Sequence, residues 1–191
     1  MKKTVITIVS VVLLCACLVG TTYAWLMDKT DTITNTFTFG NIAITLAETK
    51  GDGTGTTKSF KIVPGATIDK DPTVTVEEGS EACWLFVKIV ETNNIFDTDK
   101  KFVEYVVDSA WTELEDGVYY IQVDAETASE GKSYSVLNGN VVTVNKLATA
   151  EHFAHAQLNG NIPSITFTAY AVQAESFETA DDAWTQAKTL G

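Results

Sequence analysis

The residues most able to do chemistry lie in one short segment, Glu151-His152-Phe153-Ala154-His155. On a helix, Glu151, His152 and His155 could lie near one face and bind a metal ion. A zinc peptidase of the zincin type needs His-Glu-x-x-His, with the glutamate as general base. The order here is Glu-His-x-x-His, His-x-x-Glu-His is absent too, and the chain holds only two histidines. We therefore expect an exposed polar helix face and no cofactor, and keep these three residues as metal candidates.

No other set of residues indicates an enzyme. Cys83 is the only cysteine after residue 17. It shares an expected strand face with Leu85, Val87 and Ile89, so we interpret it as a small buried hydrophobe rather than a reactive thiol. The sequence holds no nucleophile-elbow motif and no phosphate-binding glycine loop. We expect a protein that binds or builds rather than one that catalyses a reaction.

The charge of the chain argues against two classes of partner. The sequence has 13 basic residues, all lysine, against 25 acidic residues, and a formal net charge of −12. Nucleic-acid binding needs a basic face, usually with arginine, so we expect no nucleic-acid partner. Electrostatic docking on an anionic membrane is disfavoured for the same reason.

The first 24 residues have the pattern of an export signal. Two lysines precede an apolar run over residues 5–19, which is shorter than the ~20 residues that a membrane-spanning helix needs. Small residues flank Tyr23 in the small-x-small pattern that a signal peptidase reads. We expect cleavage between Ala24 and Trp25, secretion, and membrane contact only before cleavage. An uncleaved membrane anchor is the alternative.

Most of the remaining chain alternates apolar and polar residues with the period of two that predicts half-buried β-strands. Residues 83–90 (CWLFVKIV) are instead apolar on both faces, which is typical of a central strand between two packed layers. Asp116-Gly117 and Asn138-Gly139-Asn140 predict two hairpins. The expected strands are 32–39, 42–46, 60–63, 73–77, 83–90, 102–107, 111–114, 118–123, 134–137, 141–144 and 165–173.

Two segments have the spacing of short helices. Residues 147–158 carry leucine and alanine at helical intervals, and residues 179–188 begin with the capping pattern Thr179-x-x-Asp182. The polar segments 49–59 and 93–101 predict loops. Strands and helices do not alternate, so the expected fold class is all-β, an antiparallel β-sandwich with two short accessory helices.

The start of the expected mature chain resembles the TasA/camelysin family. The resemblance rests on Trp25-Leu26-Met27-Asp28, the alternating segment 32–39 (TITNTFTF) and Gly40-Asn41, and it recurs at 62–65 (IVPG) and 168–173 (TAYAVQ). Members are secreted proteins of Gram-positive, spore-forming lineages and their relatives. They leave the cell through a dedicated signal peptidase and build biofilm-matrix fibres. The resemblance implies a jelly-roll-like sandwich.

In fibre-forming members, the segment after the cleavage site is implied to add as a strand to the next subunit. Here that donor would be residues 25–40, between a signal over 1–24 and a sandwich over 41–191. Its apolar side consists of Ile33, Phe37 and Phe39. The expected product is a head-to-tail homopolymer at the cell surface or in the biofilm matrix of a Gram-positive bacterium. The expected partners are the chain itself, the signal peptidase and other matrix proteins.

Three alternatives stay open. The same alternation fits an ordinary edge strand folded onto its own domain. A monomeric adhesion or binding module would use the loops 49–59 and 93–101. A metal-dependent peptidase at Glu151–His155 would follow the classification of camelysin as a metalloprotease.

Overall fold

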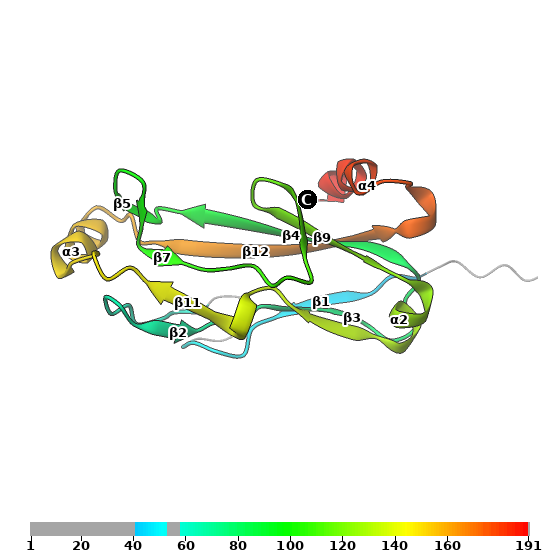
Figure 1. Cartoon of the computed structure of the whole chain (residues 1–191), viewed down its shortest axis with the longest axis horizontal. Coiled ribbons are helices and arrows are strands. Elements are labelled where there is room, and N and C mark those ends of the chain that lie inside the picture. The colour runs from blue at the N-terminus through cyan, green and yellow to red at the C-terminus, as the bar shows by residue number, and fades with distance from the viewer. Residues whose placement is uncertain (1–40, 53–57, 191) are drawn as a thin grey trace, which may run out of the picture. The chain divides into compact units, whose positions relative to one another are not determined.

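The fold is built around strand β4 (Cys83–Thr92), which lies inside a four-stranded antiparallel sheet. It pairs with β12 (Ser164–Gln173) along one edge and with β9 (Val118–Val123) along the other. Strand β8 (Thr112–Glu115) pairs with the far edge of β9. The prediction that residues 83–90 form a central strand is confirmed (Figure 1).

This computed structural model describes residues 41–52 and 58–190. The chain divides into two units after Thr38, and the described residues all belong to the second unit, Phe39–Gly191. The sequence-predicted positions that lie outside the described residues are Ala24, Trp25, Ile33, Phe37 and Phe39.

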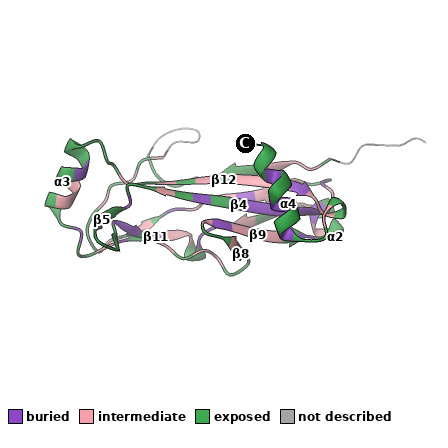
Figure 2. Ribbon diagram, turned by 90° about the horizontal axis from the view of Figure 1, so that it is seen from above, coloured by how far each residue is buried: buried purple, intermediate pink, exposed green. Residues whose placement is uncertain are grey.

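Both faces of β4 are covered, which explains why its sequence is apolar throughout. Cys83, Leu85 and Val87 are fully buried in the main core between the two layers. On the opposite face, Phe86 packs against Trp184 of helix α4 (Ala180–Ala187), with 5.3 Å between the ring centroids. Figure 2 shows buried residues along β4 and on α4.

The second layer consists of two three-stranded antiparallel sheets. One has the order β1 (Ile44–Ala47), β3 (Thr73–Val76) and β10 (Lys132–Ser135). The other has the order β2 (Thr67–Asp69), β11 (Val141–Val144) and β7 (Val103–Glu104). Their buried valines, such as those of β3, pack in the same core as β4. The fold is therefore the predicted all-β, antiparallel sandwich.

The hairpin predicted at Asp116-Gly117 is confirmed, but the one at Asn138-Gly139-Asn140 is wrong. β10 pairs with β3, whereas β11 pairs with β2 and β7. The 3-10 turn η1 (Asn138–Asn140) carries the chain from one sheet to the other. Val136 and Leu137 are fully buried at this crossing, so their burial fixes each strand in its own sheet.

Two predicted strands are largely absent and one predicted loop contains strands. Residues 60–63 form no strand, and the range 102–107 contains only β7 and an isolated bridge at Val107. The segment 93–101 contains a two-stranded hairpin of β5 (Ile95–Asp97) and β6 (Lys100–Lys101).

Both predicted helices form, as α3 (Ala150–Leu158) and α4, and their first turns are capped by Thr149 and Thr179. Helix α2 (Ala125–Glu130) was not predicted, and Asp124 caps it by accepting the Thr127 N–H at 2.8 Å. Within the described part of the chain, no helix has both the length and the apolar character needed to span a membrane.

Replacing Gly117 with alanine should lower the free energy of unfolding by about 2 kcal/mol or more. Its φ is +73°, and an added Cβ would lie 2.6 Å from the Ile89 carbonyl oxygen. Gly79→Ala is the matched control, because its φ is +79° and nothing lies within 4 Å of its added Cβ. That control should lose only about 1 kcal/mol, from backbone strain alone. Equal losses in urea unfolding of the two variants would contradict the close approach of Gly117 to β4.

Candidate functional site

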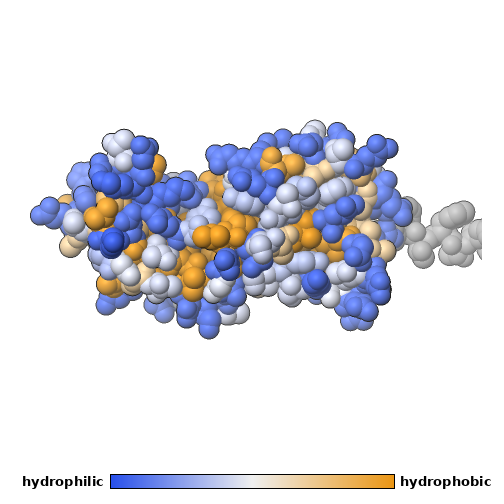
Figure 3. All heavy atoms as spheres, viewed as in Figure 1, coloured by the Kyte–Doolittle hydropathy of each residue, from blue (hydrophilic) through white to orange (hydrophobic). Residues whose placement is uncertain are grey.

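Two of the hollows on the surface of the described residues lie beside the central sheet. Apolar side chains reach the surface along the middle of the face drawn in Figure 3. A groove of about 560 Å³ lies between β1 and β12, and a cleft of about 930 Å³ lies beside the far half of β4. The two differ in chemistry, because the groove is bounded by free strand edges and the cleft by a network of charged side chains.

The groove between β1 and β12 is bounded by two strand edges without a partner in the described part of the chain. β1 pairs only with β3, and β12 only with β4. The two strands approach each other to within 8 Å between Cα atoms, yet no ladder joins them. Neighbouring strands of a sheet lie about 4.8 Å apart, so no strand fits between β1 and β12 where they approach this closely. An additional strand would pair with one of the two edges, such as that of β12.

β1 and β12 run in opposite directions along the groove. The Glu81 N–H donates to the Asn41 carbonyl at 3.0 Å, and the Glu81 carboxylate accepts from Gln173 Nε2 at 2.7 Å. The start of β1 therefore lies near the end of β12. At the other end, Glu48 and Phe167 line the same groove.

Apolar side chains along the groove pack on the core without being sealed by it. Ile165 and Phe167 contact the core cluster but are only half-buried, and Leu46 is 37% exposed. A strand with apolar residues on one side would bury these surfaces and complete the core.

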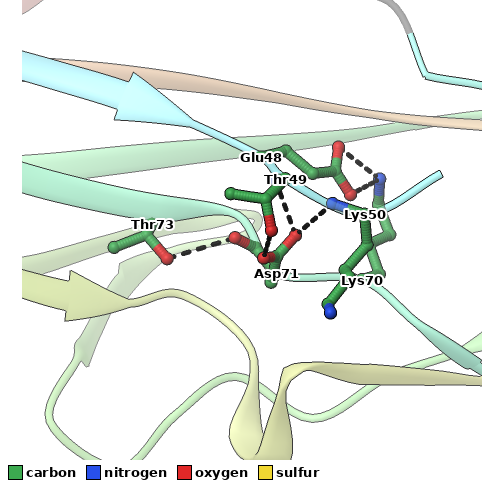
Figure 4. Close-up of polar contacts among 6 residues, drawn as sticks. All are labelled: Glu48, Thr49, Lys50, Lys70, Asp71 and Thr73. Carbon is green, nitrogen blue, oxygen red and sulfur yellow. Dashed lines mark hydrogen bonds and ion pairs between the residues drawn. The ribbon is translucent and has the colours of Figure 1, made fainter. Parts of the chain in front are cut away.

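Lys70 forms the floor of the groove and is only 7% exposed. Its ammonium donates to the two carboxylate oxygens of Glu48 at 2.9 and 3.1 Å (Figure 4). It also lies 4.6 Å from the ring centroid of Phe60 and 5.3 Å from that of Phe167. A carboxylate and two aromatic faces thus replace the water that the charge loses on burial.

Asp71 fixes the chain that follows β1. Its carboxylate accepts the backbone N–H groups of Thr49 and Lys50, each at 2.9 Å, and the Thr49 hydroxyl (Figure 4). Burial by itself would raise the pKa of Asp71, but these hydrogen bonds outweigh it and lower the pKa from its ordinary value of 3.8. Consecutive residues, Lys70 and Asp71, therefore hold one wall of the groove in place.

Acidification should test the Asp71 contact. The folded-state pKa of Asp71 lies below its ordinary value of 3.8. The ionised carboxylate therefore stabilises the folded state above pH 3.8, and this stabilisation is lost as the pH falls through the folded-state pKa. Asp71→Asn should therefore melt below the parent chain at neutral pH, and the difference should shrink as the pH falls below 3.8 and vanish once Asp71 is protonated in the folded state. Thermal unfolding from acid to neutral pH measures this difference, and one that does not change with pH would contradict the role of the charge.

The cleft beside β4 contains a hydrogen-bonded charge network centred on Glu91. Its carboxylate accepts from Lys101 Nζ at 2.7 Å, from Asn94 Nδ2 at 2.8 Å and from the Tyr105 hydroxyl. Burial would raise the pKa of Glu91, but these three donors outweigh it and lower the pKa. Burial and the Glu91 charge raise the pKa of Tyr105. The network can bind a polar ligand, but it poises neither of these groups to exchange protons near neutral pH.

Of the three metal candidates, the structure brings His152 and His155 together at one hollow of about 270 Å³, which Phe96 and Phe102 also line. His152 Nδ1 accepts the Thr149 N–H at 3.1 Å within the helix cap, and its ring lies 4.8 Å from that of Phe96. His155 Nε2 lies 3.2 Å from the amide nitrogen of Asn159, and Glu151 is exposed. Among the described residues, no group of three or more histidine, cysteine, aspartate or glutamate side chains is placed to hold a metal ion.

Cys83 is fully buried in the main core, as its strand face predicted. Burial raises the pKa of its thiol to about 11. The thiolate, which is the nucleophilic form, is therefore scarce at neutral pH.

Little in the sequence pointed to Lys70, Glu48 and Asp71 as residues of a groove. The segment Asp69-Lys70-Asp71-Pro72 indicated a polar connection, but Lys70 and Pro72 are buried. The only available signal was a lysine three residues before an apolar strand, and a long charged side chain there usually reaches solvent.

No family model matches the sequence, and no curated protein or solved structure is similar to it.

Proposed function

We propose that this chain is a secreted structural protein, a subunit of extracellular surface or biofilm-matrix fibres. Its N-terminal segment, residues 25–40, would leave its own subunit and add as a strand to the next one. The observation that carries the proposal is the groove between β1 and β12, with two strand edges that lack a partner in the described residues and half-buried apolar walls. The proposal assigns no catalytic role and no cofactor to the chain.

The side chains of the donor suit this groove. Ile33, Phe37 and Phe39 alternate with threonines, so a strand over 32–39 has a threonine side and a mainly apolar side on which Asn35 is the one polar residue. The apolar side would cover the exposed surfaces of Ile165 and Phe167, and the polar side would face water. Main-chain hydrogen bonds to the β12 edge would supply affinity, and the alternation would fix the register.

The position of Asn41 gives the assembly a direction. The described chain begins at Asn41, beside Glu81 at the end of the sandwich that carries α2. The groove residues Glu48 and Ser164 lie at the opposite ends of their strands. A donor that enters beside Ser164 of the next copy, with its own N-terminus leading, would run antiparallel to β12. Such a head-to-tail contact does not close on itself and makes a filament.

Deleting residues 25–40 from the mature chain, Trp25–Gly191, should abolish polymers and leave a folded monomer. A synthetic peptide of residues 25–40 added to this shortened chain should bind with one-to-one stoichiometry, and a scrambled peptide should not. Calorimetry measures the binding and sedimentation measures the polymers. Polymers of the shortened chain that match those of the parent would overturn strand donation.

Two single lysine substitutions, one on each side of the donor strand, test which side enters the groove. Phe37→Lys places a charge on the side that would enter the groove, so it should prevent polymerisation. Thr36→Lys places the same charge on the side that would face water, so it should be tolerated. Equal polymerisation of the two variants by light scattering would argue that residues 32–39 do not insert with this register.

The cleft at Glu91 favours a second candidate function, a monomeric secreted adhesion or binding module. Lys101, at the end of the predicted loop 93–101, lines this cleft together with Tyr105 and Tyr119. Under this alternative the mature chain would stay monomeric with residues 25–40 present, and substituting Lys101 would impair ligand binding.

A further inference from the structure

The cleft beside β4 exists because the two neighbours of this strand differ in length. β12 pairs with β4 as far as Thr92, whereas the pairing of β9 ends at Val118, opposite Lys88. The next contact is the Ile89 N–H, which donates to the Gly117 carbonyl at 2.7 Å in the β8–β9 turn. The last part of β4 therefore lies beside a cleft of about 930 Å³, a size typical of ligand sites.

The lining of this cleft combines two aromatic rings with charged groups of both signs. Tyr105 and Tyr119 are half-buried, because they pack on the core and also line the cleft. The charged residues of the lining are Glu91, Glu104, Asp116, Lys88 and Lys101. Lys88 and Asp116 are exposed, and neither takes part in an ion pair among the described residues. Both can therefore bind a ligand without breaking an existing pair.

This mixture of charges disfavours ions and apolar molecules as ligands. An anion and a cation would each meet groups of their own charge. An apolar ligand would remove water from charged side chains without replacing it. The lining instead suits a neutral molecule that offers both hydrogen-bond donors and acceptors.

An added peptide strand finds little room on this side of β4. Beyond Ile89, only Val90–Thr92 lack a neighbour there among the described strands. The side chain of Asn94 then occupies the next main-chain groups, since its Oδ1 accepts the Val103 N–H at 2.9 Å and its Nδ2 donates to the Val103 carbonyl at 2.8 Å. The open edge is therefore too short for a strand to pair along it.

We infer that this cleft binds a neutral saccharide. A hydroxyl group both donates and accepts, so one sugar ring can bond carboxylates and ammonium groups together. The apolar C–H faces of the ring can lie against the rings of Tyr105 and Tyr119. The inference goes beyond the fibre proposal, because the cleft shares no lining residue with the groove between β1 and β12. It also gives a ligand class to the second candidate function.

The cleft is assigned binding rather than hydrolysis of the saccharide. Glycosidases pair two carboxyl groups and keep one of them protonated near neutral pH. Glu91 is the one half-buried carboxylate of the lining. Burial raises its pKa, but the hydrogen bonds from Lys101 and Asn94 outweigh burial and lower it. Glu91 is therefore not held as a proton donor.

Calorimetric titration of the mature chain, Trp25–Gly191, tests the inference with neutral probes: maltohexaose, cellohexaose and N-acetylchitohexaose. At least one should bind with a Kd below about 1 mM, and added salt should not weaken it, because the probe carries no charge. A chitosan hexamer, which is cationic, and oligogalacturonate, which is anionic, should bind at least about tenfold more weakly. Binding of none of the neutral probes, or tighter binding of a charged one, overturns the inference.

Matched variants locate the site. Lys101→Ala removes a donor of the lining and should weaken binding at least about tenfold. Lys100→Ala is the control, because it removes the same charge from the same hairpin and Lys100 does not line the cleft. Tyr119→Leu should also weaken binding, whereas Tyr119→Phe keeps the ring and should not. Equal affinity of Lys100→Ala and Lys101→Ala, in chains with unchanged thermal unfolding, overturns the inference.

Sedimentation of the same chains separates this site from strand donation. Lys101→Ala should polymerise like the parent, because Lys101 does not line the groove. Phe37→Lys should stay monomeric and still bind the saccharide, so failure of either proposal leaves the other standing. If the peptide of residues 25–40 displaces the saccharide in competition, the cleft is the strand acceptor and the saccharide site is wrong.

Discussion

Replacing Lys70 with alanine should lower the free energy of unfolding by about 3–5 kcal/mol, because Glu48 would keep a buried charge without a partner. The side chain of Lys70 is 9% exposed and that of Glu48 is 17% exposed. Two aromatic faces, of Phe60 and Phe167, also lose their cation. Urea unfolding of the parent and the variant, monitored by tryptophan fluorescence, measures the loss.

A double-mutant cycle gives the control for this pair. Lys70→Met combined with Glu48→Leu removes both charges and keeps apolar volume, so the double variant should recover most of the lost stability. Lys70→Met alone should stay strongly destabilised. Additive losses in the two single variants would show that the pair is not coupled, and would contradict its role as the floor of the groove.

Replacing Phe86 with alanine should also cost about 3–5 kcal/mol, since it empties a large buried volume between β4 and α4. Phe86 is fully buried and lies 5.3 Å from the ring of Trp184. The loss should appear in the free energy of unfolding at neutral pH.

Phe86→Leu is the matched control, because it keeps apolar volume and should cost about 1–2 kcal/mol. Hydrogen exchange gives an independent readout, since the amides of α4 should lose protection in the alanine variant more than those of β3, which lies in the other core layer. Unchanged protection of α4 would argue that the helix does not depend on the outer face of β4.

The central strand and the two capped helices could be predicted because their signals are local. Residues 83–90 are apolar on both faces, and β4 is covered by the core on one side and by α4 on the other. Thr179 and Asp182 predicted the start of α4, and Thr179 does cap it. Such features follow from the spacing of neighbouring residues, which a single sequence contains.

Strand partners and the groove could not be predicted, because they depend on contacts far apart in the chain. Asn138-Gly139-Asn140 specifies a turn with positive φ, but buried Leu137 bridges Val107 and the following strand pairs elsewhere. Helix α2 has only Ala128 buried, so it lacks the apolar stripe that signals a helix.

The groove could not be predicted for the same reason, because its residues come from segments that are far apart in the chain. Lys70 became a buried residue only because Phe60, Phe167 and Glu48 converge on it from three segments. That the edges of β1 and β12 lack a partner among the described strands likewise follows from the order of strands in each sheet. A periodic pattern shows that a strand has two faces, but it does not show which of its edges will be left without a neighbour.

Negative-stain electron microscopy of the mature chain, Trp25–Gly191, tests strand donation most directly. Parent, Phe37→Lys and Thr36→Lys chains are concentrated side by side at neutral and mildly acidic pH, because the overall negative charge opposes association until carboxylates are protonated. The account predicts regular fibres from the parent and from Thr36→Lys, and monomers from Phe37→Lys. Monomers of the parent chain at both pH values, or fibres from all three chains, would contradict it.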